Sequence, residues 1–215
     1  MKIGVFDSGV GGLSVANAIR QALPNDEVIL REDRKHVPYG TRKPAEIFKF
    51  VVPIFQELID SGCQVIVVAC NTVTTTLITD LRQKFNVPLI AIEPMVKPAA
   101  ELSKTHIIAV CATLTTLASP RYAQLKQDYA GSTTVIEPDC SDWAAMIEEE
   151  RINREAIKRM VEQVLVAGAD VIVLACTHYH WIEAEINRLA KGRAVILQPE
   201  QATITQLKRE LARLG

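Results

Sequence analysis

Two cysteines stand in closely similar surroundings in different halves of this 215-residue chain. The apolar run VIVVA ends at Cys70, and the run VIVLA ends at Cys176. Gly62 and Gly168 precede the two cysteines by the same number of residues, and short polar residues follow both. This repetition indicates an internal duplication that places two thiols in equivalent positions.

A pair of thiols on opposite sides of one ligand suits the inversion of a stereocentre without a cofactor. One thiolate removes a proton from one face of a carbon, and the partner thiol supplies a proton to the other face. A free thiol has a pKa of about 8.5, which neighbouring groups can bring toward working pH. Such neighbours are Asn71 and Thr72 beside the first cysteine, and Thr177 and His178 beside the second.

The elements that position these thiols are visible as short apolar runs that alternate with amphipathic stretches, a pattern typical of strands alternating with helices. The predicted strands are residues 2–6, 27–31, 64–69, 88–92, 106–110, 133–137, 170–175 and 194–198. The clearest helical patterns cover residues 43–62, 74–86, 153–169 and 203–215. Continuous apolar strands favour parallel sheets with helices on both faces. Ligands of such sheets bind outside the carboxyl ends of the strands, where both cysteines stand.

The helix and strand pattern is interrupted near the middle of the chain by Pro94 and Pro98. We therefore expect an α/β protein with a first domain of residues 1–95 and a second domain of residues 96–199. The last helix, about residues 200–215, could return to pack on the first domain.

A glycine-rich loop, DSGVGG, follows the first predicted strand. It departs from the dinucleotide-binding fingerprint GxGxxG because Ser14 occupies the place of the third glycine, and the carboxylate of Asp7 would repel a phosphate. Asp7 could instead pair with the ammonium group of an amino acid or take up a proton beside a thiol. Backbone N–H groups at the start of the next helix would suit a carboxylate. A structural alternative is a tight turn in which Asp7 or Ser8 caps the helix.

Composition and charge argue against several classes of partner. With 48% apolar residues, 23% charged residues and a net charge of −1, the chain lacks the basic patch expected for nucleic acid or an anionic membrane. We find no apolar signal stretch and no run of roughly 18 apolar residues, so we expect a cytoplasmic protein. Cys63, Cys111 and Cys140 form no CxxC pair and are expected to be buried free thiols, not disulfides or metal ligands.

Five motifs along the chain resemble, in their order and spacing, the signatures of the glutamate racemase family. They are FDSGVGGLSV at 6–15, PYG at 38–40, ACNT at 69–72, EPMVKPA at 93–99 and CTHY at 176–179. The resemblance implies two similar parallel-sheet α/β domains related by a pseudo-twofold axis, with the active site between them and no cofactor or metal. It also implies interconversion of L- and D-glutamate, which supplies D-glutamate for peptidoglycan, and it is compatible with a homodimer.

The resemblance further implies roles for individual residues. Cys70 and Cys176 match the two catalytic cysteines, and Asp7 and His178 match residues that assist proton transfer at them. Glu148 matches a third assisting carboxylate, although two more glutamates follow it and a solvated acidic helix end is an equal alternative. The residues that match those binding the amino acid are Ser8, Pro38, Tyr39, Gly40, Asn71, Thr72, Thr116 and Thr177.

Four positions depart from the family pattern. Ala175 stands where the family has Gly, and Gln198 stands where it tends to have Asp. His36 replaces an Arg and is interpreted as a solitary surface histidine. His180 replaces a Pro, and it could be neutral or could perturb the second thiol.

Three hypotheses about function remain open at this point. The first is a racemase of glutamate, with aspartate or another acidic amino acid as the nearest variant. The second is a hydrolase in which Cys176 is the nucleophile and His178 the base, which leaves Cys70 unexplained. The third is a non-catalytic amino-acid-binding descendant of the same fold.

Overall fold

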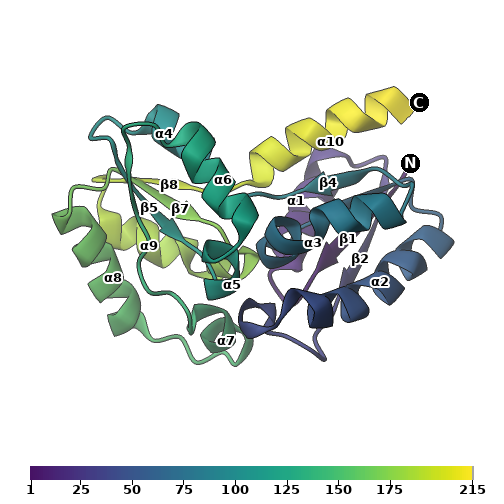
Figure 1. Cartoon of the computed structure of the whole chain (residues 1–215), viewed down its shortest axis with the longest axis horizontal. Coiled ribbons are helices and arrows are strands. Elements are labelled where there is room, and N and C mark those ends of the chain that lie inside the picture. The colour runs from purple at the N-terminus through teal and green to yellow at the C-terminus, as the bar shows by residue number, and fades with distance from the viewer. Residues whose placement is uncertain (215) are drawn as a thin grey trace.

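The eight strands of the computed structural model, which describes residues 1–214, form two parallel sheets with the same strand order (Figure 1). The first sheet has the order β2-β1-β3-β4 and the second the order β6-β5-β7-β8. The strands are β1 (Lys2–Asp7), β2 (Glu27–Glu32), β3 (Val65–Val68), β4 (Leu89–Ala91), β5 (Ile107–Cys111), β6 (Thr134–Ile136), β7 (Val171–Leu174) and β8 (Val195–Leu197). The predicted α/β class and the eight predicted strands are confirmed.

Helices cover both sheets and connect their parallel strands. They are α1 (Gly12–Ala22), η1 (Tyr39–Thr41), α2 (Pro44–Asp60), α3 (Asn71–Lys84), α4 (Val96–Leu102), α5 (Leu114–Leu117), α6 (Pro120–Tyr129), α7 (Trp143–Glu148), α8 (Arg154–Val166), η2 (Thr177–Ile182), α9 (Glu183–Ala190) and α10 (Glu200–Leu214). Gly215, the last residue of the final predicted helix, lies outside the described residues. Among the described residues, no helix is both long and apolar enough to cross a membrane.

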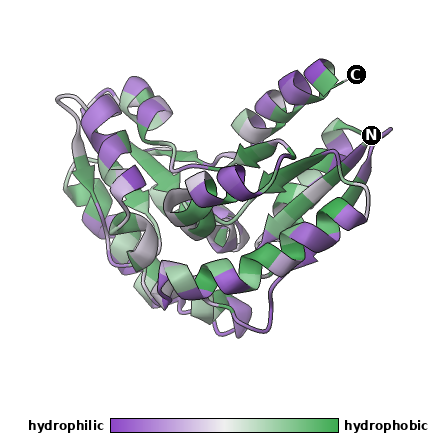
Figure 2. Cartoon of the chain, turned by 45° about the vertical axis from the view of Figure 1, so that its right-hand side comes forward, coloured by the Kyte–Doolittle hydropathy of each residue, from purple (hydrophilic) through white to green (hydrophobic). Residues whose placement is uncertain are grey.

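The strands that lead to the cysteines are buried on both faces, which explains their unbroken apolar sequences. In β3, Ile66 and Val68 pack into one hydrophobic core, and Val65 and Val67 pack into another on the opposite face. The residues of β7 divide between two further cores in the same alternating way. Side chains of successive strand residues point to opposite faces, so both faces of β3 and β7 need apolar residues. In Figure 2 the central strands have the green colour of hydrophobic residues and lie between helices.

The glycines before the two cysteine-bearing strands adopt the same unusual conformation. Gly62 has φ +85° and Gly168 has φ +92°, each just after the end of a helix, α2 or α8. This left-handed region favours glycine because it has no Cβ. The shared backbone and shared strand order support the duplication inferred from sequence.

The C-terminal helix α10 packs on the first sheet (Figure 1). Its residues Ile204, Leu207 and Leu211 are buried in the same core as Ile3 and Val5 of β1. We therefore propose that α10 belongs with residues 1–95 in one domain and that residues 96–199 form the other.

Candidate active site

The carboxyl ends of β1, β3 and β7 deliver the predicted chemical groups to one cavity between the two sheets. Cys70 follows β3 at the start of α3, and Cys176 follows β7 at the start of η2. The cavity is tight, with only about 10 Å³ of space open to a water-sized molecule, and the two cysteines on its wall are 5% and 7% exposed. Its lining residues are Ser8, Pro38, Tyr39, Gly40, Cys70, Asn71, Thr72, Thr113, Ala144, Cys176, Thr177 and His178.

The first thiol lies beside groups from the end of β1. The Sγ atom of Cys70 is 3.4 Å from the Oγ atom of Ser8. Burial and the nearby negative charge of Asp7 raise the pKa of Cys70 to about 12. In the absence of substrate, Cys70 is therefore a protonated thiol, able to give a proton.

Asp7 itself is fully buried and lies between the two halves. Its carboxylate accepts a hydrogen bond from the Thr177 hydroxyl, at 3.1 and 3.2 Å from the two oxygens, and one from the Gly9 N–H at 3.2 Å. Burial raises the pKa of Asp7 to about 6, although the charge of His178 and these hydrogen bonds oppose the shift. A carboxyl group with this pKa can exchange a proton near neutral pH.

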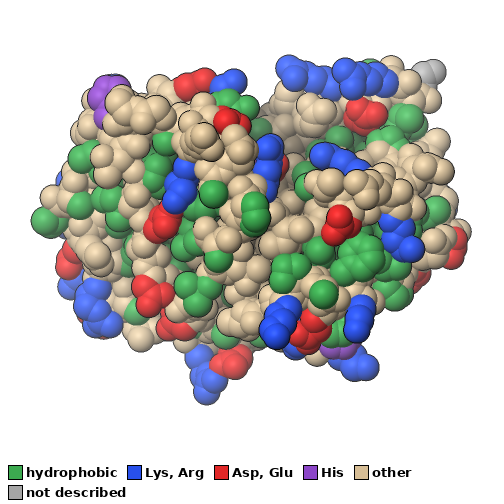
Figure 3. All heavy atoms as spheres, in the orientation of Figure 1, with side chains coloured by type: hydrophobic (Ala, Val, Ile, Leu, Met, Phe, Trp, Pro, Cys, Tyr) green, Lys and Arg blue, Asp and Glu red, His purple; other side chains and the backbone are tan. Residues whose placement is uncertain are grey.

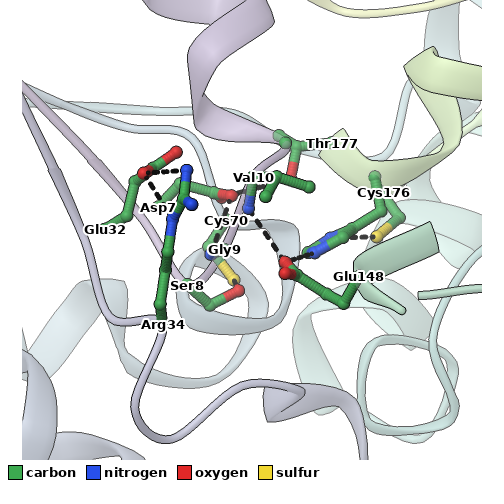
Figure 4. A network of polar contacts seen from close by, with 12 residues as sticks. Asp7, Ser8, Gly9, Val10, Glu32, Arg34, Cys70, Glu148, Cys176 and Thr177 are labelled. Carbon is green, nitrogen blue, oxygen red and sulfur yellow. Dashed lines mark hydrogen bonds and ion pairs between the residues drawn. The ribbon is translucent and has the colours of Figure 1, made fainter. Parts of the chain in front are cut away.

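The second thiol belongs to a chain of three polar side chains, shown in Figure 4. The Sγ atom of Cys176 is 3.7 Å from Nδ1 of His178, whose Nε2 lies 2.6 Å from Oε1 of Glu148. Burial would lower the pKa of His178, but its hydrogen bonds with Cys176 and Glu148 raise it to about 10. Although burial opposes the effect, the hydrogen bonds of Glu148 with His178 and Val10 leave the pKa of Glu148 lowered. A cationic imidazole therefore lies within hydrogen-bonding distance of the Cys176 sulfur.

The glycine-rich loop presses closely against the second half of the protein. The backbone N–H of Val10 donates to Oε1 of Glu148 at 2.8 Å. A Cβ atom at Gly9 would collide with Glu148, and one at Gly11 would lie 2.6 Å from the Thr177 backbone. The N-cap of α1 is Gly11, with no side-chain cap, so the alternative that Asp7 or Ser8 caps this helix is wrong. The glycines permit close packing between the halves.

Comparison with known proteins shows which family this chain belongs to. The profile of the Asp/Glu/Hydantoin racemase family matches residues 3–207. The chain belongs to this family. Among its relatives, glutamate racemase from Pseudomonas syringae pv. tomato is 37% identical, and the match covers 99% of this chain and 79% of the relative. Glutamate racemase from Herpetosiphon aurantiacus is 38% identical over 98% of this chain and 84% of the relative.

Solved structures of racemases have the same architecture. Escherichia coli glutamate racemase, in complex with L-glutamate and the activator UDP-MurNAc-Ala, is similar with a TM-score of 0.88 at 29% identity, over 96% of this chain and 80% of that one. The Francisella tularensis enzyme, in complex with D-glutamate, has a TM-score of 0.81 at 28% identity, over 99% and 81% of the two chains. The prediction that this protein is a racemase, and therefore an isomerase, is confirmed.

Within this racemase fold, the predicted substrate-binding residues are brought together with one exception. Thr116 lies behind the cavity wall, where its hydroxyl accepts a hydrogen bond from Thr113 at 3.0 Å. Thr113, which the sequence analysis missed, lines the cavity and lies 3.0 Å from the hydroxyl of Thr72. Thr113 is the N-cap of α5, and its side chain accepts from the Thr116 N–H, but this helix of four residues gave no sequence signal.

The amide of Asn71 is the clearest sign of an expected ligand. Both its Oδ1 and Nδ2 atoms are buried and have no hydrogen-bond partner among the described residues. A buried polar group without a partner costs about 1–3 kcal/mol, so native proteins rarely keep one without a reason. Asn71 lines the cavity, where a bound polar molecule would satisfy it.

The turn that carries Tyr39 and Gly40 is held by groups that sequence analysis did not foresee. The Tyr39 hydroxyl donates to Oδ2 of the buried Asp33 at 2.6 Å, and the carbonyl of Gly40 accepts from Thr115 at 2.6 Å. His36 lies 2.8 Å from Asp33 and stacks on Phe50 with ring centroids 3.8 Å apart. The interpretation of His36 as a solitary surface histidine is therefore wrong.

The remaining predicted positions also find partners. Glu148 is inserted between His178 and Val10, an arrangement that favours a role in the site over a solvated helix end. Gln198 donates to Glu183 at 2.6 Å, away from the thiols. As expected, the buried Cys63, Cys111 and Cys140 form no disulfide. Among residues 1–214, no three His, Cys, Asp or Glu side chains gather in a geometry that could hold a metal ion.

Proposed function

We propose that this racemase interconverts L- and D-glutamate with Cys70 and Cys176 as its two acid and base groups. The observation that carries the proposal is that both thiols line one enclosed cavity from different halves of the protein. The names of its relatives, which are glutamate racemases at 37–38% identity, favour glutamate over other acidic amino acids. The product D-glutamate would supply peptidoglycan synthesis.

Each turnover moves two protons and leaves the net charge unchanged. The thiolate of one cysteine takes the α-proton, so the C–H bond breaks, an S–H bond forms and the carbon holds the electron pair. The thiol of the other cysteine then gives its proton to the opposite face, so its S–H bond breaks and a new C–H bond forms. The two cysteines have exchanged protonation states, and a proton shift through neighbouring groups or solvent restores them.

The two thiols have different neighbours at the start of this cycle. The raised pKa of Cys70 makes it the proton donor of the resting enzyme. We assign Cys176 as the base, because its sulfur lies 3.7 Å from His178, whose imidazole is held by Glu148. In the reverse direction these roles exchange. Asp7, whose pKa is raised to about 6, can take up or release a proton beside Cys70.

The amino acid would be held by polar groups around the cavity. The unsatisfied amide of Asn71 can accept from the substrate ammonium and donate to a carboxylate. Backbone N–H groups at the start of α3, next to Cys70, suit a carboxylate. The hydroxyl oxygens of Thr72, Thr113 and Thr177 line the cavity and offer acceptors for the ammonium group.

Incubation of the purified, reduced protein with L-glutamate or L-aspartate in D2O tests the proposal. Circular dichroism should show loss of optical activity with glutamate, and NMR should show deuterium at the α-carbon. Racemisation of aspartate but not of glutamate would show that aspartate is the substrate. Binding without exchange would favour the non-catalytic descendant, and a covalent acyl adduct on Cys176 would favour the hydrolase.

A further inference from the structure

The two halves of the protein meet along a line of polar contacts at the start of α1. Asp7 binds the Thr177 hydroxyl, and the Val10 N–H donates to Glu148. A third contact lies farther along the same helix, at Ser14, and involves no residue of the catalytic cavity. This outer contact has no role in the proton transfers described above.

The outer contact joins three elements through the side chain of His180. Its Nδ1 atom lies 3.2 Å from Oγ of Ser14 and 3.3 Å from Oε1 of Glu200. The Ser14 hydroxyl donates to the carbonyl of Gly11 at 2.9 Å, so its oxygen is available to accept from Nδ1. The His180 side chain is only 4% exposed, and that of Glu200 is 25% exposed. The hydrogen bond from His180, though opposed by burial, lowers the pKa of Glu200, so this carboxyl is held ionised.

The three residues of this contact lie on elements that belong to different halves of the protein. Ser14 lies on α1 of the first half, and His180 lies on η2, the turn that also carries Cys176 and His178. Glu200 is the first residue of α10, which packs on the first half immediately after the chain leaves β8 of the second (Figure 1). His180 therefore ties the catalytic turn to the place where the chain crosses between the halves.

The cavity between the halves is closed around its thiols. Cys70 and Cys176 are 5% and 7% exposed, and their reactive faces are covered by both halves. In Figure 3 the two halves meet in continuous surface over much of this face. An amino acid can reach the thiols only if the cavity widens, and contacts that cross between the halves oppose this widening.

We infer that His180, Glu200 and Ser14 form a latch that holds the two halves closed around the substrate cavity. The inference rests on the proposed function only in identifying that cavity as the substrate site. His180 and Glu200 are positioning residues. His180 lies on the catalytic turn and Glu200 contacts it, but neither contacts the reacting atoms. Their loss should open the cavity without disturbing either core.

Site-resolved alkylation of the cysteines tests the latch without requiring turnover. The variants His180→Leu and Glu200→Gln would be exposed to iodoacetamide, and the modification of each cysteine would be followed by peptide mass spectrometry. Loss of a hydrogen bond to a charged group should raise the labelling rate of Cys70 and Cys176 about tenfold. Cys111 and Cys140, which are 0% and 1% exposed in the core of the second half, should label no faster than in the parent.

Two matched variants separate the latch from unspecific effects. His180→Asn keeps a donor close to the Nδ1 position and should label at nearly the parent rate. Glu185→Gln removes a carboxylate that pairs with Arg188 on α9 of the second half, and it should change no rate. In the latch variants, KM for glutamate should rise more than kcat falls, because the closed state is less populated.

Three outcomes would overturn the latch. Unchanged labelling of Cys70 would show that the halves open equally often without His180. Faster labelling of Cys176 alone would show a local change in η2, and faster labelling of all five cysteines would show general loosening of the fold. If the parent proved inactive while Cys70 and Cys176 labelled faster in His180→Leu, the latch would stand and the proposed function would fail.

Discussion

The two halves of this racemase build their cysteine sites from the same backbone but give them different proton partners. In each site the cysteine follows a buried strand, and a glycine in the left-handed region of φ precedes that strand. Cys70 has the Ser8 hydroxyl 3.4 Å away and a buried carboxyl nearby, whereas Cys176 has an imidazole bonded to Glu148. The comparison teaches that the repeated backbone places two thiols on one cavity, and that the side chains around each thiol differ.

The largest effect should follow removal of either thiol, because inversion needs a proton group on each face. Cys70→Ala and Cys176→Ala should each reduce racemisation of glutamate by about 10³-fold or more, the upper range for loss of a general acid or base. Chiral chromatography of the product measures this. Substantial turnover by either variant would show that the two sites are not both required.

Replacement of Asp7 sharpens the comparison through stability. Its pKa is raised from 3.8 to about 6, so the fold favours the protonated carboxyl, and this contribution to stability is complete below about pH 4 and lost as pH rises through about 6. Asp7→Asn should therefore raise the free energy of unfolding at pH 8 by up to about 3 kcal/mol more than at pH 4. Urea denaturation at the two pH values measures the difference. An equal effect at both would mean that burial does not raise the pKa of Asp7.

A smaller and one-sided effect should follow Glu148→Gln. The variant removes the charge that holds His178 cationic, so it should slow exchange of the α-hydrogen that faces Cys176 by about tenfold. Exchange of the other enantiomer, whose α-hydrogen faces Cys70, should slow much less. NMR in D2O measures both, with Glu149→Gln, an exposed neighbour in the same helix end, as the control. Equal slowing of both enantiomers would contradict the assignment of Glu148 to one thiol.

Much of the fold could be predicted because its strands are buried on both faces and therefore read as unbroken apolar runs. The shorter helices α4, α5, α6, α7 and α9 were not among the predicted helices, since short helices show few repeats of an apolar face. The thiol pair was predictable because it was repeated. The contact of Val10 with Glu148 joins residues 138 positions apart, and Asp33 supports Tyr39 from behind the cavity. Such pairs depend on how the halves pack, which local pattern does not report.

The most direct test of the central claim is α-hydrogen exchange of pure L- and pure D-glutamate in D2O by the two single-cysteine variants. Each variant keeps one thiol, which can exchange only the hydrogen that faces it. The account predicts that Cys70→Ala exchanges one enantiomer and Cys176→Ala exchanges the other, both without inversion. Exchange of the same enantiomer by both variants, or of both enantiomers by either, would contradict two thiols on opposite faces of the substrate.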